Sequence, residues 1–324
     1  MDLELLKQSL PNLHTVNFTE KSLEELQYDR VLEKYAKRFK IYQKDFSSYL
    51  FRPHAIGTLM GGLPKPLTER QDETLTAFQL KIDSGKGLTE KQYIDYGSLL
   101  EKKHAKPILS DGAKTYLKKI FKEITFQRTE ELKSKYLDKG IIQEPISILA
   151  LSEFHGVEYV KNDKRYENDF FIGEPDIVEP AEVIDIKSSW DYTTFPMFDE
   201  ELKNKNYYWQ IMAYMYLLGV KKGRVIYVLV NTPDQLIDGE KYRVSRELGL
   251  LSEDLQFGLP EDLDFEIDRN MRYEDIPQEG RIKEFEVFYN EKEVEHMKSM
   301  IILSREYLEK LNRDLESRFV NHLK

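Results

Sequence analysis

Two acidic residues and a lysine are the side chains in this sequence whose spacing best fits chemistry. Asp176 closes a short apolar run, and Asp185 and Lys187 lie in a second apolar run after a turn signal. Side chains two apart on a strand share a face, so Asp185 and Lys187 point the same way while Ile184 and Ile186 face the core. The sequence therefore predicts a β-hairpin that brings two carboxylates and a lysine to one edge of a buried sheet.

Hard oxygen ligands of this kind suit Mg²⁺ or Mn²⁺, and a lysine beside a metal-bound water can position or activate that water. The backbone carbonyl of Ile186 is a further possible ligand. The Asp-x-Lys pattern alone occurs often by chance, and by itself it fits a surface hairpin with solvated charges better. Two other polar residues favour the metal site: Glu144 on a predicted helix before the hairpin, and Gln210 on a predicted helix, residues 206–219, after it.

Each of these helical residues also has an ordinary structural interpretation. A single glutamate on an amphipathic helix usually faces solvent, and a buried glutamine can be satisfied by a structural hydrogen bond. Pro145 directly follows Glu144 and removes a backbone hydrogen bond, so the helix either begins near Lys139 or is kinked at the proline. Gln210 and Tyr214 are four residues apart and share a helix face.

The composition is that of a globular protein. The chain has 324 residues, of which 40% are hydrophobic and 33% are charged. It contains no cysteine, which excludes disulfides, thiolate zinc sites and iron–sulfur clusters. No apolar run reaches the ~18 residues of a membrane-spanning helix, and the start of the chain lacks the pattern of a secretory signal. We therefore expect a cytoplasmic protein without a membrane association.

The net charge of −10 weighs against nucleic-acid binding, but the charge is unevenly distributed. Residues 30–52 carry a balance of +5 and residues 102–139 a balance of +6, whereas residues 238–285 carry −7. Phosphate contacts depend on the local field rather than on the total charge, so binding to DNA stays open. Taken singly, each basic stretch equally fits a solvated helix face.

The hydrophobic patterns predict a mainly helical N-terminal region, residues 1–128, that packs on a core formed by residues 129–324. An acidic insertion with loop character is expected at about 235–280. The other predicted elements of the core are strands at 157–161, 224–230 and 281–289, and a long terminal helix at 291–323.

The order and spacing of the motifs resemble a known family. The segments are Lys139-Gly140-x-x-x-Glu144, Gly173-Glu174-Pro175-Asp176, Asp185-Ile186-Lys187, Gln210 and Asn231-Thr232-Pro233. This order resembles the lambda-exonuclease/YqaJ-like viral recombinase branch of the PD-(D/E)xK nuclease superfamily. The resemblance covers residues 133–233 and, more loosely, 281–315. It implies an α/β fold with a restriction-endonuclease-like core, in which helices flank a central mixed sheet, and here a helical N-terminal extension.

The resemblance also assigns roles to residues. It makes Glu144, Asp176 and Asp185 metal ligands and catalytic residues together with Lys187, and it places Gln210 as a support of the site. His54 stands where the family has a hydroxyl residue. The residues expected to contact DNA are Arg52, His54, Ser188, Tyr214, Lys135 and Lys139.

The implied activity is that of a magnesium-dependent exonuclease, with Mn²⁺ able to substitute, that digests linear double-stranded DNA from 5′ to 3′ in phage-type recombination. The family further implies a homo-oligomeric ring, for example a trimer, a single-strand annealing protein as partner, and a bacterial host cell if the chain is phage-encoded. Two alternatives remain: a restriction or RecB-type endonuclease with the same site, and an inactive DNA-binding protein of the same fold.

Overall fold

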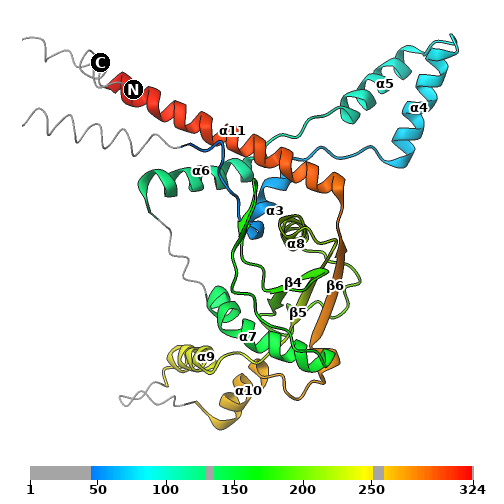
Figure 1. Cartoon of the computed structure of the whole chain (residues 1–324). Helices are drawn as coiled ribbons and strands as arrows, with labels where there is room; N and C mark the ends of the chain where they lie inside the picture. Colours follow the sequence, from blue (N-terminus) through cyan, green and yellow to red (C-terminus); the bar gives the residue numbers. More distant parts are fainter. Residues whose placement is uncertain (1–44, 129–134, 251–258, 323–324) are drawn as a thin grey trace, which may run out of the picture. The chain divides into compact units, whose positions relative to one another are not determined.

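The computed structural model describes residues 45–128, 135–250 and 259–322 (Figure 1). By their contacts, the residues fall into two compact units. The first unit comprises Met1–Tyr49, Thr58–Thr129 and Glu295–Lys324, and the second comprises Leu50–Gly57 and Glu130–Val294. This grouping differs from the predicted domains at two places, because residues 50–57 join the second unit and most of the terminal helix joins the first.

The described part of the first unit is helical. It contains α4 (Glu69–Asp83), α5 (Glu90–Lys103), α6 (Asp111–Phe126) and most of α11 (Glu291–His322). Threonine–glutamine capping boxes begin α4 and α5, so their first backbone N–H groups are satisfied locally. Although α11 spans 32 residues, neither it nor any other described helix is long and apolar enough to cross a membrane.

The second unit is built on a mixed four-stranded sheet with the order β3-β4-β5-β6. The strands are β3 (Ile177–Val178), β4 (Glu182–Ser188), β5 (Lys222–Val228) and β6 (Ile282–Phe288). β4 pairs antiparallel with β3 and parallel with β5, and β5 pairs antiparallel with β6. The expected central mixed sheet flanked by helices is therefore confirmed.

Two helices cover opposite faces of this sheet (Figure 1). The apolar side chains of α7 (Lys135–His155) pack on one face, in a core that includes Ile184 and Ile186 of β4. α8 (Lys205–Leu218) lies on the other face, where the side chains of Asp185 and Lys187 point. The alternation along β4 thus separates an apolar face from a polar one, as its sequence predicts.

The predicted hairpin is confirmed, with Ile177 opposite Ile184 and the turn closed by a Glu179 N–H···O=C Glu182 hydrogen bond of 3.0 Å. The strand predicted at 157–161 is wrong, because this segment has no regular structure. The chain continues as a loop, which is hydrogen-bonded to the turn before β3: Asn162 N–H donates to the Asp176 carbonyl at 2.7 Å.

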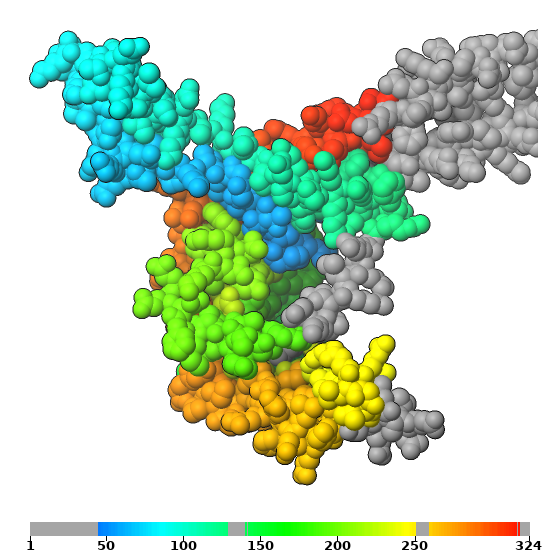
Figure 2. Space-filling model, turned by 180° about the vertical axis from the view of Figure 1, so that it is seen from behind, coloured from blue at the N-terminus to red at the C-terminus, as the bar shows by residue number. Residues whose placement is uncertain are grey.

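The acidic insertion is more ordered than its sequence predicts. It contains α9 (Asp234–Glu247) and α10 (Glu261–Met271), which lie side by side (Figures 1 and 2). Lys241 of α9 forms ion pairs of 2.9 Å with both Asp264 and Asp268 of α10. The loop character expected from the charge is therefore wrong for these residues, since the acidic side chains of α10 are partly neutralised by a lysine from its neighbour.

Candidate active site

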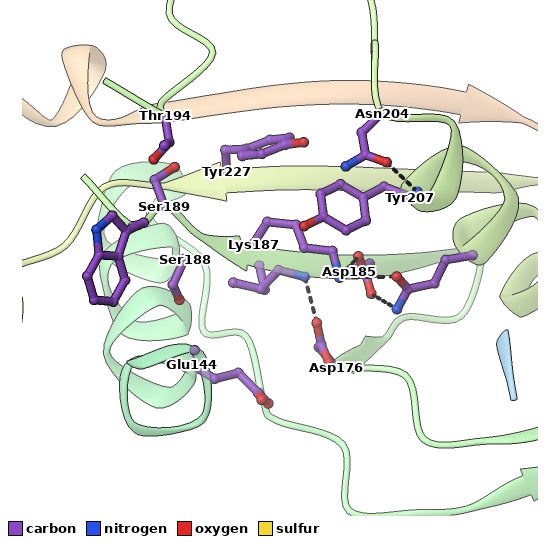
Figure 3. A pocket seen from close by; sticks show the side chains of 14 residues that line it. Glu144, Asp176, Asp185, Lys187, Ser188, Ser189, Thr194, Asn204, Tyr207 and Tyr227 are labelled. Atoms are coloured by element: carbon purple, nitrogen blue, oxygen red, sulfur yellow. Dashed lines mark hydrogen bonds and ion pairs between the residues drawn. The ribbon is translucent and has the colours of Figure 1, made fainter. Parts of the chain in front are cut away.

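A pocket of about 600 Å³ opens at the carboxyl ends of the parallel strands β4 and β5 (Figure 3). Both strands end at this edge, so polar residues at their ends are brought together there, as is usual for ligand sites on α/β sheets. The pocket is lined by residues 185–190 of β4 and its continuation, Tyr227 of β5, Tyr207 and Gln210 of α8 with its N-cap Asn204, Gly140 and Glu144 of α7, Asp176 and Thr194.

Asp176 reaches the pocket because β3 begins only at the next residue. The Ile186 N–H of β4 lies beyond the ladder with β3, and the Asp176 carboxylate accepts its hydrogen bond at 2.6 Å. The N–H and C=O of one strand residue point to the same side. The Ile186 carbonyl therefore faces the side on which Asp176 lies, which is the position expected of a backbone ligand.

Asp185 and Lys187 form the centre of the site. The Lys187 Nζ lies 2.7 Å from Asp185 Oδ2, and the Asp185 side chain is only 1% exposed. Gln210 joins both, because its Nε2 donates to Asp185 Oδ1 at 2.8 Å and its Oε1 accepts from Lys187 Nζ at 3.2 Å. Gln210 is thus buried and hydrogen-bonded to a carboxylate of the pocket.

The titration behaviour of the two aspartates reflects their enclosure. Burial raises the pKa of Asp176 to about 8, and the nearby charge of Asp185 adds to this rise. Burial also raises the pKa of Asp185, against the attraction of Lys187. For Lys187, burial acts to lower the pKa, but Asp185 and Asp176 outweigh it and raise the pKa above its usual value. Such perturbed groups in one pocket are typical of functional sites.

Glu144 lies on α7 at the side of the same pocket (Figure 3). The helix continues through Pro145 and begins before Lys139, so the first of the two predicted alternatives, a start near Lys139, is wrong. The Glu144 carboxylate forms an ion pair with Lys161, at 2.8 Å between Oε1 and Nζ. Its charge also contributes to the raised pKa values of Asp176 and Asp185, after burial as the main cause.

The donor set fits a hard divalent cation. Asp176, Asp185 and the Ile186 carbonyl supply oxygen atoms, and a bound cation would stabilise the ionised form of the two aspartates, which burial chiefly disfavours. Within the described ranges, no three His, Asp or Glu side chains stand close enough together to hold a metal ion as they are. Glu144 could complete the ligands, and a cation would then compete with Lys161 for its carboxylate.

The residues expected to contact DNA fall into three groups. Ser188 lines the pocket and its hydroxyl lies 2.9 Å from that of Ser147. Arg52, His54 and Tyr214 line a second, separate cavity of about 200 Å³. The side chains of Lys135 and Lys139, near the start of α7, lie outside the described part of the chain.

In the second cavity Arg52 and His54 share the wall with Arg165 and Glu174, which form an ion pair of 2.7 Å. Tyr214 donates a hydrogen bond to the Glu174 carbonyl at 3.1 Å. Desolvation lowers the pKa of His54, as do the charges of Arg52 and Lys187, so His54 is neutral near pH 7. The structure therefore does not bring Arg52, His54 and Tyr214 into the pocket of Lys187.

Several pocket residues could not be selected from the sequence. Lys187 Nζ lies 4.5 Å from the ring centre of Tyr207, a cation–π contact, and the Tyr207 ring is 6.0 Å from that of Tyr227. Tyr207 is three residues before Gln210 on α8, so its helical spacing was an available signal. Tyr227 lies opposite Lys187 because β4 and β5 pair in that register, and only the strand pairing shows this. Among the described atoms, the buried Ser189 hydroxyl has no hydrogen-bond partner.

Comparison with known proteins finds a similarity of fold. No protein-family model matches the chain, and no curated protein matches its sequence. The crystal structure of a phage-related exonuclease from Haemophilus somnus 129PT superposes with a TM-score of 0.56 at 22% identity, over 83% of this chain and 97% of that one. The chain shares the fold of a phage-related exonuclease.

A second solved structure, an alkaline exonuclease from Laribacter hongkongensis, covers 65% of this chain and 87% of its own length at 10% identity. Its TM-score of 0.46 is too low to support an inference. The expected resemblance to exonucleases of phage type is thus confirmed, at the level of the fold. The roles of the individual residues stay predictions.

Proposed function

We propose that this chain is a metal-dependent deoxyribonuclease with a PD-(D/E)xK-type site, and that it acts as an exonuclease on the ends of linear double-stranded DNA. The observation that carries the proposal is the convergence of Asp176, Asp185 and Lys187 in one pocket, with both aspartate pKa values raised. A buried and a partly buried carboxylate beside a lysine match what phosphodiester hydrolysis requires, namely a cation site and a group that orients the attacking water.

Asp176, Asp185 and the Ile186 carbonyl would hold Mg²⁺ or Mn²⁺, with Glu144 as a further ligand. The bound cation would supply an activated water and stabilise the charge that develops at phosphorus. Gln210 keeps Asp185 Oδ1 in place through its 2.8 Å hydrogen bond. Lys187, between Asp185 and the Tyr207 ring, is positioned to orient a water molecule with its ammonium group.

The 5′ to 3′ polarity, the ring-shaped oligomer, the annealing partner and the role in phage recombination rest on the family resemblance and stay predictions. The same holds for phosphate contacts by Arg52, His54, Ser188 and Tyr214. The two basic side chains of the second cavity, Arg52 and Arg165, are compatible with an anion, although Glu174 neutralises Arg165.

The test is digestion of end-labelled linear duplex and of closed circular DNA, with Mg²⁺ and with EDTA. Wild-type protein should degrade only the linear form and only with Mg²⁺. Asp185→Asn keeps the shape of the side chain but removes one ligand charge, and should lower the rate by at least ~100-fold. Asp163→Asn, an exposed aspartate of the same unit, is the matched control.

Each other outcome has a defined meaning. Cleavage of the circle would identify an endonuclease with this site. Binding of DNA without cleavage by folded protein would identify a DNA-binding protein. Full activity of Asp185→Asn would refute the assignment of the pocket.

A further inference from the structure

Lys161 is the cation that holds Glu144 at the rim of the pocket. The distance between its Nζ and Glu144 Oε1 is 2.8 Å, and the Lys161 side chain is half exposed. Glu144 itself lines the pocket together with Asp176 and Asp185. Lys161 is therefore bound to a residue of the pocket wall and is itself half exposed to solvent.

The segment that carries Lys161 is attached to the turn that presents Asp176. Asn162 donates its backbone N–H to the Asp176 carbonyl at 2.7 Å and its Nδ2 to the Pro175 carbonyl at 2.9 Å. Three residues further on, Arg165 Nε donates to Glu174 Oε1 at 2.7 Å. These contacts fix the backbone beside Lys161 to residues 174–176, so the position of Lys161 is tied to the site.

Two lysines thus pair with two of the acidic side chains that line the pocket. Lys187 pairs with Asp185 at 2.7 Å, and Lys161 pairs with Glu144 at 2.8 Å. A divalent cation on the aspartates would compete with both ammonium groups for carboxylate oxygens. An ammonium group that loses its carboxylate at the mouth of a nuclease pocket has one obvious replacement partner, a phosphate oxygen of the substrate.

We propose that Lys161 is a substrate-positioning residue controlled by Glu144: it pairs with Glu144 in the cation-free site, and when Glu144 turns to a bound divalent cation, the released ammonium group binds a DNA phosphate at the rim of the pocket. This inference rests on the proposed nuclease function. Its consequence is a positive coupling between cation binding and DNA binding, part of which passes through Lys161. Such coupling is reciprocal, because each ligand strengthens the other by the same factor.

The experiment measures binding rather than cleavage. The affinity for a fluorescent blunt duplex is determined by anisotropy in EDTA and in Ca²⁺, an oxygen-seeking cation, using the full chain. Wild-type protein should bind DNA more tightly in Ca²⁺, and Lys161→Met should reduce the ratio of the two affinities about two- to five-fold, because the coupling through Lys161 cannot exceed the strength of its ion pair with Glu144. Lys161→Arg, which keeps the charge, should preserve most of the ratio.

Lys164→Met is the matched control. It removes the same charge from the same segment, and Lys164 contacts Asn162 through its backbone. It should weaken DNA binding equally in EDTA and in Ca²⁺, leaving the ratio unchanged. In a Glu144→Gln background, Lys161→Met should no longer alter the ratio, because the carboxylate that controls the lysine is absent.

Calcium binding without DNA gives an independent measurement. Removing the competing ammonium group should tighten Ca²⁺ binding to Lys161→Met about two- to five-fold relative to Lys164→Met, the range of a partly exposed ion pair. A Lys161→Met protein that behaves like Lys164→Met in both measurements would overturn the inference alone. Absence of DNA binding by the wild-type protein would overturn both the inference and the proposed function.

Discussion

Replacing Asp176 by asparagine should stabilise the cation-free protein at alkaline pH. Asparagine keeps the shape of the side chain, and its Oδ1 can still accept the hydrogen bond that Ile186 N–H donates at 2.6 Å. It removes the negative charge, which burial and the neighbouring Asp185 both disfavour. The substitution therefore tests the charge of Asp176 separately from its packing.

The expected size follows from the pKa of Asp176, which rises from 3.8 to about 8 on folding. The folded protein keeps a proton that the unfolded chain releases near pH 4, so wild-type stability falls as the pH rises from about 4 to 8. If Asp176 alone carried this shift, the free energy of unfolding would fall by ~6 kcal/mol over this pH range. Because asparagine also deprives Lys187 of a counter-charge, we expect a net gain of about 2–3 kcal/mol near pH 8.5 and little gain near pH 4.

The assay is thermal and urea unfolding of both proteins in EDTA across this pH range. A gain of 2 kcal/mol should raise the melting temperature by about 4–8 °C near pH 8.5. Asp163→Asn, on an exposed loop position of the same unit, should change stability by less than about 0.5 kcal/mol. A difference between Asp176→Asn and wild type that does not vary with pH, or a loss of stability at alkaline pH, would refute the electrostatic argument.

Two further predictions concern the scaffold. Gly223→Ala should lower the free energy of unfolding in urea by about 1–3 kcal/mol, because a Cβ on β5 would lie 2.5 Å from Ile211 Cγ1 of α8. An unchanged urea midpoint would show that α8 shifts to make room for the Cβ. Arg224→Met should cost about 3 kcal/mol, since it leaves Glu182 and Glu284 without the guanidinium that lies 2.8 Å from Glu284 Oε2. Arg243→Met, at an exposed arginine that also pairs with glutamates, is the control and should lower the free energy of unfolding much less than Arg224→Met does. Equal losses in the two variants would contradict the argument from burial.

The sequence by itself determined those features that depend on residues close together along the chain, such as the faces of a strand and the end of a helix. The alternation along β4 fixes which side chains face the core, because successive residues of a strand point to opposite faces. The end of α8 was also local information, since Gly219 adopts the positive φ of 72° that ends a helix. The order of Glu144, Asp176, Asp185 and Lys187 along the chain predicted that they share a site, and all four line one pocket.

The insertion shows where local signals fail. Its charge predicted a loop, but charge alone does not prevent a helix when a neighbouring element supplies a counter-ion. Lys241 of α9 does this for Asp264 and Asp268 of α10. The strand predicted at 157–161 failed for a related reason, because the loop that follows it bonds to the turn at Pro175 and Asp176 rather than to a strand of the sheet.

Only the tertiary structure decided which residues meet across long stretches of chain. Tyr227 faces Lys187 because β4 and β5 pair in parallel register, and Lys161 meets Glu144 because its loop is fastened to the turn before β3. It also placed Arg52 in a cavity apart from the pocket. The physical reason is the range of the interactions: periodicity and caps act within a few residues, whereas strand register and ion pairs between loops arise only when distant segments pack.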